Sequence, residues 1–545
     1  MDAGRQVTFP VDHPVGVLYV RPRQPAPDVE WEIFALAQGA VDVPADYELR
    51  LSVAPWHLFH HPVYRCVLSH HPDLAQELRE MLVPFDARAA LRALRTLGAD
   101  DLQSLTLSQV PALEDDDLVH IAHLTGLEEL DIGGRKKHIT GNGLLHLLGL
   151  TNLRSIKLSC PSLTDDSVKY LARLPGLRNV NLNLTSVSGA GLQPLQEHRL
   201  ERLSLQGTKL DDSGMQYLSA FETIEYLDVG DNPVTGASLA SLASLRRLKE
   251  LVLQRTQVSD FGNGSISALS GLVSLHAAKT PISDNSVRQL TGIPELSSLL
   301  IDDTAVTDAG ARELAASNVA TLGISGTLIT DTGCQALAGV PTLRSIDICE
   351  TGCTSRGVGI FLSNPTLESI DFSRTDVGDK ALSELATDSQ LTRLIASTTA
   401  VSSDGVCYLA RAPMLQELDL SGTRIGDSAI ACLASLKQLR SLWISDTGVG
   451  DRGLEKIGAM ASLVTLDLAR LPVTDAGLHH VAALKQLQNL ILSGTRVTDD
   501  GVKRLSSTET LRTLNLTDIP ASHVSAQCVL ELQRRLPLCF ILSAL

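Results

Sequence analysis

A segment of about 24 residues recurs along most of this chain, and it restricts the folds that the chain can adopt. In one copy, LQELDLSGTRIGDSAIACLASLKQL, Leu415, Leu418 and Leu420 alternate as in a short strand with one buried face. Ile430 and Leu433 follow at helical spacing. One strand and one short helix cannot bury their apolar faces alone. The segment therefore has to pack against copies of itself, as in a solenoid.

The copies can be followed through eighteen predicted strand starts, from Leu102 to Leu511, almost always 24 residues apart. Their shared pattern, L-x-x-L-x-L-x-x-T-x-[VI]-[TS]-D-x-G-[LV]-x-x-L, resembles the leucine-rich repeat family. The subtype it resembles is the cysteine-containing, ribonuclease-inhibitor-like repeat of F-box adaptors and long bacterial arrays. The resemblance covers roughly residues 94–545. It implies an α/β horseshoe-shaped solenoid of about 18 strand–helix repeats with a parallel concave sheet.

Four segments are predicted: an N-terminal β-rich cap (1–55), a His- and aromatic-rich and helical connector (56–92), the repeat array (93–523) and a C-terminal cap (524–545). A terminal repeat exposes one apolar side, so a solenoid needs a cap with a polar outer surface at each end. The short β-prone runs that predict the N-terminal cap are residues 15–20, 31–34 and 47–53. A helix over 524–536 and a strand over 537–541 are expected to close the other end.

The connector holds an unusual group of potential metal ligands: His57, His60, His61, Cys66, His70 and His71. The first three histidines would share one face of a helix, so a zinc or other transition-metal site with Cys66 as a fourth ligand is one hypothesis. The segment lacks the Cys-x-x-Cys and His-Glu-x-x-His spacings. We therefore favour an aromatic, partly buried loop with histidines as amphipathic filler, and we expect no metal and no cofactor.

Nine cysteines, an odd number, are scattered along the chain. Cys334, Cys407 and Cys432 fall in the helical half of their repeats, where a small apolar residue packs, so buried free thiols are expected there. Cys349 and Cys353 share one repeat but have no histidine nearby, which argues against a metal site.

The first residues contain no apolar run, and nothing resembles a membrane span. A reduced, cytoplasmic protein with no membrane partner is expected.

Two polar positions recur in the repeat. A Thr three residues after the last apolar strand position, for example Thr423, is expected to donate from its hydroxyl to a backbone carbonyl in the turn that leaves the strand. The [TS]-D pairs that follow, such as Thr307-Asp308 and Thr330-Asp331, could suggest calcium. Each pair precedes a helical pattern, however, so we interpret them as helix caps.

The strand face is where a partner is expected, because the residue between the last two apolar positions of each strand should point to solvent. Along the array, this position brings apolar side chains together with carboxylates. Aromatic side chains ringed by charge are typical of protein-binding hot spots. The alternative is that Trp443 merely fills space against its neighbours. The candidate partner-binding residues are Trp443, Ile395, Ile491, Asp419, Asp467, Asp347 and Asp371.

The predicted function is a non-enzymatic scaffold that binds a protein on the concave face. A formal charge of −16 argues against nucleic acid or an anionic membrane as the main partner. No G-x-S-x-G, P-loop or kinase motif occurs, and no catalytic residues are assigned. Two alternatives remain: a substrate-recognition adaptor of a ubiquitin-ligase-like complex, although residues 72–100 lack an F-box pattern, and metal binding through residues 57–71.

Overall fold

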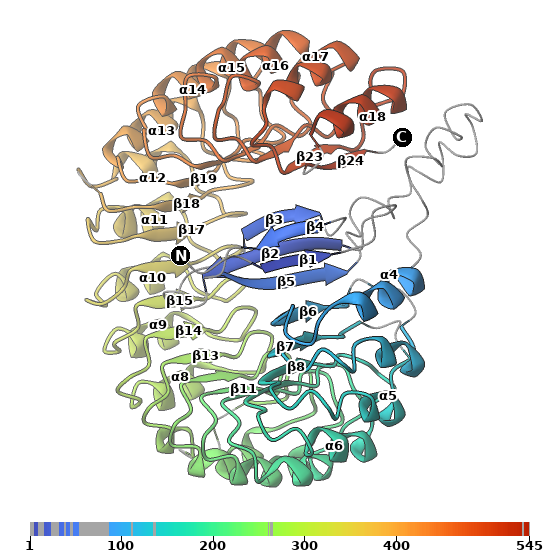
Figure 1. Ribbon diagram of the computed structural model, residues 1–545. Helices are drawn as coiled ribbons and strands as arrows, with labels where there is room; N and C mark the ends of the chain where they lie inside the picture. Colours follow the sequence, from blue (N-terminus) through green and yellow to red (C-terminus); the bar gives the residue numbers. More distant parts are fainter. Residues whose placement is uncertain are drawn as a thin grey trace. The chain divides into compact units, whose positions relative to one another are not determined.

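The computed structural model (Figure 1) describes residues 5–8, 16–22, 32–36, 40–43, 47–53 and 87–543, the last range with short gaps at 109, 111–112, 135–137, 260, 262–264, 388 and 537–538. The chain forms two compact units. The first contains the strands up to β13 (Ser274–His276), and the second begins with α8 (Asp284–Leu290) and contains the strands from β14 (Ser298–Leu300) onward.

The N-terminal residues form antiparallel pairs. β1 (Arg5–Thr8) pairs with β4 (Ala40–Val43), and β2 (Gly16–Pro22) pairs with both β3 (Glu32–Leu36) and β5 (Tyr47–Val53). The three β-prone runs are therefore strands. β5 also pairs in parallel with the first repeat strand, β6 (Ser104–Thr106). It thereby covers a sheet edge that would otherwise expose unpaired backbone groups.

All eighteen predicted repeat strands are present, and within each unit consecutive strands pair in parallel. In the first unit, β6 is followed by β7 (Glu129–Asp131), β8 (Ser155–Lys157), β9 (Asn179–Asn181), β10 (Arg202–Ser204), β11 (Tyr226–Asp228), β12 (Glu250–Val252) and β13. In the second unit, β14 is followed by β15 (Thr321–Gly323), β16 (Ser345–Asp347), β17 (Ser369–Asp371), β18 (Arg393–Ile395), β19 (Glu417–Asp419), β20 (Ser441–Trp443), β21 (Thr465–Asp467), β22 (Asn489–Ile491), β23 (Thr513–Leu516) and the closing β24 (Phe540–Ser543).

Short helices follow the strands in both units. The first unit has α4 (Ala87–Ala93), η1 (Leu94–Thr96), η2 (Asp115–His120), α5 (Gly141–Leu145), α6 (Asp165–Leu171), η3 (Ala190–Leu195), α7 (Asp212–Met215), η4 (Gln216–Ala220), η5 (Gly236–Ser244) and η6 (Ser265–Ala268). After α8, the second unit has α9 (Asp308–Leu314), α10 (Asp331–Leu337), α11 (Ser355–Leu362), α12 (Asp379–Ser383), α13 (Ser403–Val406), η7 (Cys407–Arg411), α14 (Asp427–Leu433), α15 (Asp451–Ile457), α16 (Asp475–Val481), α17 (Asp499–Arg504), η8 (Leu505–Ser507) and α18 (Ala526–Arg535). Within the described ranges, none of these helices is long and apolar enough to cross a bilayer.

The core consists of the apolar positions that the repeat predicts. Leu415, Leu418, Leu420, Ile430 and Leu433 are all fully buried. Strands and helices lie on opposite sides of this core, and Figure 1 shows the helices of the second unit following one another along one side. The α/β class and the parallel sheet are therefore as predicted.

The recurring Thr behaves as expected. In twelve repeats its hydroxyl donates to the carbonyl three residues earlier, at 2.5–2.8 Å, as Thr423 does to Leu420. The residue just before this Thr has a positive φ, for example 53° at Arg374 and 67° at Gly422. The hydroxyl thus secures a tight turn within its own repeat. Asn232 differs, because its amide also donates to the carbonyl of Leu205 in the preceding repeat.

The [TS]-D pairs cap helices, but the Asp acts on the next repeat. Asp308 accepts from the backbone N–H of Thr330 at 2.8 Å, from its hydroxyl at 2.7 Å and from the N–H of Gly333 at 2.9 Å. Thr330 in turn caps α10. The same carboxylate-to-cap contact, which we call a rung, is made by Asp115, Asp165, Asp212, Asp284, Asp331, Asp379, Asp427, Asp451, Asp475 and Asp499. Each rung therefore joins the start of one helix to the start of the next.

The rungs explain the Gly of the T-D-x-G pattern. A Cβ on Gly333 would lie 2.5 Å from Oδ1 of Asp308, and equivalent distances at the other rung glycines are 2.2–2.8 Å. At two positions the sequence changes on both sides of this contact. Ser355 and Ser403 replace the rung Asp, and each accepts through a single hydroxyl oxygen, as Ser403 does from the N–H of Gly426 at 3.0 Å. In the two repeats that follow them, Ala381 and Ala429 replace the Gly.

These paired replacements predict a measurable coupling. Ser403→Asp should destabilise the fold because the new carboxylate would meet the Cβ of Ala429. Adding Ala429→Gly should restore most of the stability, since the pair then copies the rung of Asp427 with Gly450 and Gly453. In a double-mutant cycle by chemical denaturation, we expect a coupling free energy of about 1 kcal/mol or more.

Ala429→Gly alone is the control, and it should cost about 1 kcal/mol through helix propensity. Simple additivity of the two single changes would contradict the steric account of the rung.

Candidate functional site

The seven residues predicted to bind a partner lie in one row across the second unit. Consecutive strands β16 to β22 place them directly beside one another. The order is Asp347, Asp371, Ile395, Asp419, Trp443, Asp467 and Ile491, which we call the strand-face row. Residues 24 apart in sequence are therefore neighbours about 4.8 Å apart. From Asp371 onward, carboxylate and apolar side chains alternate.

The row is only partly open to solvent. Trp443 and Ile491 are half-buried, as are the four carboxylates. Ile395 differs from the expectation of an exposed apolar side chain, because only 9% of it is accessible. Its neighbours in register are Asp371 and Asp419. Trp443 and Ile491 are thus the more accessible apolar members of the row.

Each carboxylate in the row is also held by its own strand. Asp347, Asp371, Asp419 and Asp467 accept from the backbone N–H two residues later at 2.8–3.0 Å. Asn515, at the same position of β23, makes the same contact with Thr517 at 2.9 Å. The bond therefore requires an oxygen acceptor but no charge.

The charge itself is unfavourable at this position. Burial raises the pKa of Asp467, and the charge of Asp419 adds to the effect. Burial likewise raises the pKa of Asp371, with a further contribution from the charge of Asp347. Both shifts mean that the folded state disfavours the ionised carboxylate. Asp371 and Asp467 therefore carry negative charge at a cost in stability.

Three carboxylates near the row are paired with arginines, whereas the described residues show no ion pair for those within it. Arg393 Nε lies 3.2 Å from Glu417 Oε2, Arg470 Nε donates to Asp446 at 2.7 Å, and Arg374 pairs with Glu350. Among the described residues, no cation lies within ion-pair distance of the four row carboxylates. The nearest cationic influence on Asp371 is a longer-range one from Arg393.

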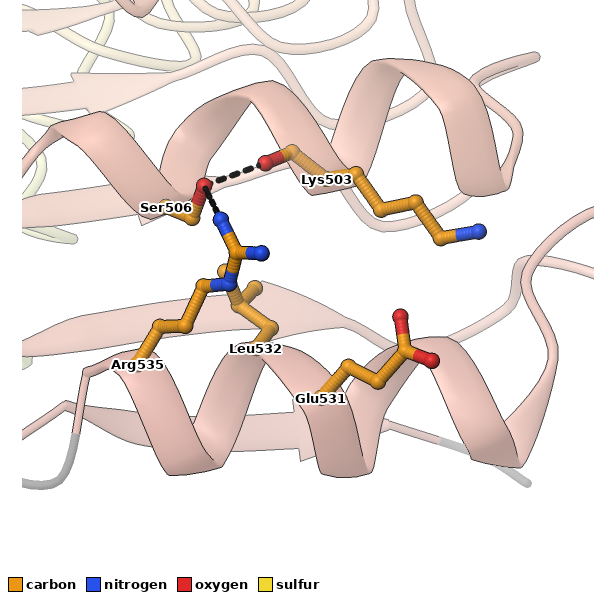
Figure 2. A pocket seen from close by; sticks show the side chains of 5 residues that line it. All are labelled: Lys503, Ser506, Glu531, Leu532 and Arg535. Atoms are coloured by element: carbon orange, nitrogen blue, oxygen red, sulfur yellow. Dashed lines mark hydrogen bonds between the residues drawn. The ribbon is translucent and has the colours of Figure 1, made fainter.

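A small pocket lies between the last helices of the second unit. Lys503, Ser506, Glu531, Leu532 and Arg535 line it, and its volume is about 90 Å³ (Figure 2). Arg535 Nη1 lies 3.5 Å from Ser506 Oγ, and the Ser506 hydroxyl donates to the carbonyl of Lys503 at 2.7 Å. Pockets for small-molecule ligands are roughly 300–1,000 Å³. This one is too small for such a ligand.

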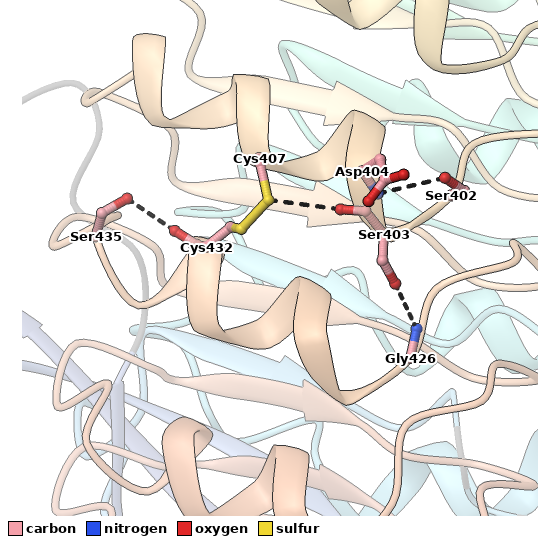
Figure 3. Close-up of a disulfide and its surroundings, with 7 residues drawn as sticks. All are labelled: Ser402, Ser403, Asp404, Cys407, Gly426, Cys432 and Ser435. Atoms are coloured by element: carbon pink, nitrogen blue, oxygen red, sulfur yellow. Dashed lines mark hydrogen bonds between the residues drawn. A yellow bond between two sulfur atoms is a disulfide. The ribbon is translucent and has the colours of Figure 1, made fainter.

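Cys407 and Cys432 form a disulfide, which corrects the expectation that both are buried free thiols (Figure 3). The two cysteines lie 25 residues apart in η7 and α14, with their Cα atoms 5.0 Å apart. Cys407 is exposed and Cys432 half-buried. They therefore lie outside the packed positions of their helices, where neighbouring repeats bring them within bonding distance.

The other cysteines in the described residues are free. Cys334 is buried as expected, and its hydrogen bond to Cys353, together with burial, raises its pKa. Burial raises the pKa of Cys528 and of Cys539 to about 12. Such thiols are unreactive.

Residues 57–71, including the six potential metal ligands, lie outside the described residues, so the metal hypothesis stays untested. In the ranges that are described, His, Cys, Asp and Glu form no cluster of metal-ligating geometry.

Comparisons with known proteins agree with this architecture. A family model described as "Leucine Rich repeat" matches residues 363–386 and 411–434. The mouse RP105/MD-1 complex is similar at a TM-score of 0.50 and 18% identity, covering 82% of this chain and 79% of that chain. The chain folds as a leucine-rich-repeat solenoid.

Two further structures have lower scores. An internalin from Listeria monocytogenes covers 55% of this solenoid and 82% of its own chain at 24% identity, with a TM-score of 0.42. The TLR13–ssRNA13 complex covers 78% of this solenoid and 71% of its own chain at 16% identity, with a TM-score of 0.49. No curated protein sequence matches this one.

Sequence reasoning missed two features of the solenoid. The rungs escaped notice, although the paired replacements Ser355/Ala381 and Ser403/Ala429 were a signal in the printed sequence. The disulfide could have been suggested by two cysteines close to one repeat length apart. Neither feature can be read from a single repeat, because each joins residues of adjacent repeats.

Asp467→Asn should leave the fold intact and raise its stability slightly at neutral pH. The amide can keep the bond to the N–H of Ala469, as Asn515 shows, and it removes an unfavourable charge. Because the folded-state pKa of Asp467 lies above its ordinary value of 3.8, the charge penalty is fully present above the raised pKa and disappears below about pH 3.8.

Thermal unfolding of the Asn variant and wild type across this pH range tests the account. A variant less stable than wild type at pH 7 would show that the carboxylate is needed as an anion.

The disulfide should be detectable and stabilising. Non-reducing peptide mapping should recover a peptide that joins Cys407 to Cys432, and reduction or Cys407→Ser should speed hydrogen exchange in the repeats of η7 and α14. Closing a 25-residue loop stabilises by about 3.5 kcal/mol in the chain-entropy account. Cys334→Ser, at a buried free thiol, is a control that should form the same linked peptide. Recovery of both peptides as free thiols from protein purified without reductant would contradict the structure.

Proposed function

We propose that the protein is a non-enzymatic scaffold that binds a protein partner on the strand face of its second unit. The leucine-rich-repeat fold is typical of protein-interaction scaffolds and receptors. The observation that supports this site is Trp443, a half-buried aromatic side chain flanked in register by Asp419 and Asp467. Large aromatic side chains at the centre of a polar surface are characteristic of binding hot spots.

The remaining expectations stay proposals about the same scaffold. We propose no catalytic centre, no cofactor and no nucleic-acid or membrane partner. The T-D-x-G pattern supports the cysteine-containing, ribonuclease-inhibitor-like subtype and a similarity to long bacterial arrays. The ubiquitin-ligase adaptor hypothesis gains no support from the described residues, since it depends mainly on residues 72–100, of which only 87–100 are described.

A cytoplasmic location also remains a proposal, and the disulfide makes it testable. Disulfides form and persist mainly in oxidising compartments. Alkylating the thiols of intact cells before lysis should show Cys407 and Cys432 as free thiols if the protein resides in a reducing cytoplasm. A disulfide already present in the cells would favour an oxidising compartment instead.

Trp443→Ala should release the partner and leave the fold intact. Truncating a central interface Trp costs about 2 kcal/mol or more, which is roughly a thirtyfold loss of affinity. Partners captured from the native host by the wild type and by the variant can be compared quantitatively. Tyr408→Ala is the matched control, because Tyr408 is an exposed aromatic side chain on the helical side of the same unit.

Equal recovery of a partner by wild type and the Trp443 variant, with loss in the Tyr408 variant, would place the interface on the helices. Equal recovery by all three would remove the support for this row.

A further inference from the structure

We infer that the partner presents a cationic amphipathic helix to the strand-face row, with one helical turn over each strand and Lys or Arg side chains over Asp419 and Asp467. This inference rests on the proposed function, because it specifies the chemistry of the partner that docks at Trp443.

The first step of the argument is that Trp443 cannot be covered alone. Its neighbours in register are Asp419 and Asp467, one strand away on each side. That distance is about 4.8 Å, well within the footprint of any partner that covers an indole ring. A partner on Trp443 therefore also takes water away from both carboxylates.

The second step concerns the charge on those carboxylates. Each accepts a hydrogen bond through one oxygen from a backbone N–H two residues later, at 2.8 Å for Asp419 and 2.9 Å for Asp467. Neither belongs to an ion pair among the described residues, whereas Glu417 and Asp446 nearby are paired with Arg393 and Arg470. Burying an unpaired charge costs several kcal/mol, roughly, unless the partner supplies a compensating charge. A neutral or acidic partner would bear that cost, and a cationic one would not.

The third step is the spacing of the row. Ile395, Trp443 and Ile491 are two strands apart, or about 9.6 Å, with a carboxylate midway between each pair. A helix that lies across the strands advances about 5.4 Å per turn, so successive turns would meet successive strands. Apolar residues at i+7 and i+14 would reach Trp443 and Ile491, and one at i would lie over the nearly buried Ile395. Cations at i+3 or i+4, and at i+10 or i+11, would reach the carboxylates.

An extended peptide does not match this pattern. Its same-face side chains are about 6.6 Å apart, which falls out of step with a 4.8 Å strand spacing after two positions. Over the four strand spacings from Ile395 to Ile491, the helix and the row differ by roughly 2 Å, which long Arg and Lys side chains can span.

The test uses the full chain and a defined probe. The probe is a fluorescein-labelled, helix-forming 18-residue peptide with Leu at positions 1, 8 and 15 and Arg at positions 4, 5, 11 and 12, and the control peptide has Glu in place of Arg. We expect the Arg peptide to bind wild type with an affinity that falls as salt rises. The Glu peptide should not bind.

Charge-only variants identify the site. Asp419→Asn combined with Asp467→Asn should weaken the Arg peptide about tenfold or more, because both charges lie under the helix. Asp131→Asn is the control for a row-equivalent carboxylate elsewhere, since Asp131 makes the same backbone bond, to Gly133 at 2.8 Å, but lies on β7 in the first unit and pairs with Lys157 at 3.6 Å. It should bind the peptide as wild type does.

No binding of the Arg peptide, equal binding of the Glu peptide, or equal binding by the double Asn variant would each overturn the inference. Its failure can be distinguished from that of the proposed function. If the captured native partner is lost with Trp443→Ala but kept with the double Asn variant, the row binds a partner that is not cationic. If neither variant affects capture, both proposals fail.

Discussion

The solenoid depends on a carboxylate shared between adjacent repeats. The first amides of a helix have no partner within the helix, and the rung Asp of the preceding repeat accepts from the backbone and hydroxyl of the residue that caps it. In the rung of Asp308, a single side chain receives three donors from the next repeat, at 2.7–2.9 Å. Hydrogen bonds to charged acceptors are worth about 1.5–3 kcal/mol each. Each rung therefore couples the start of one helix to the repeat before it.

A rung requires close contact between the Asp and the next helix. That contact restricts which residue can lie opposite the carboxylate. The rung carboxylate approaches so near that Gly lies opposite it in most rungs, with Ser238 and Cys528 as exceptions. Where Ser takes the place of the carboxylate, as at Ser355 and Ser403, Ala lies opposite. A motif that looks like a catalytic or metal-binding pattern is thus a matter of steric fit. The rung aspartates also account for part of the net negative charge, because their carboxylates serve to stabilise the fold.

Aspartates on the strand side have a different role. There the carboxylate is anchored to its own strand, and the Asn at β23 shows that the anchor needs no charge. Burial and neighbouring carboxylates raise the pKa of Asp371 and of Asp467, so the ionised forms are retained at some cost in stability. The fold does not require these charges, so the stability lost by keeping them ionised is typical of a binding surface. On this basis the row around Trp443 is the better candidate for function than the pocket beside Lys503, which is small and lined by exposed charged groups.

The sequence by itself determined the repeat, the eighteen strands, the parallel sheet and the buried positions such as Leu418 and Leu420, because these follow from an apolar pattern within 24 residues. It also placed Trp443 and its neighbours at equivalent positions, which made the row predictable. Only the tertiary structure decided the rungs, the disulfide of Cys407 with Cys432 and the limited exposure of Ile395. Each of these depends on how closely two adjacent repeats approach, to within a few ångströms, and a pattern inside one repeat carries no information about that distance.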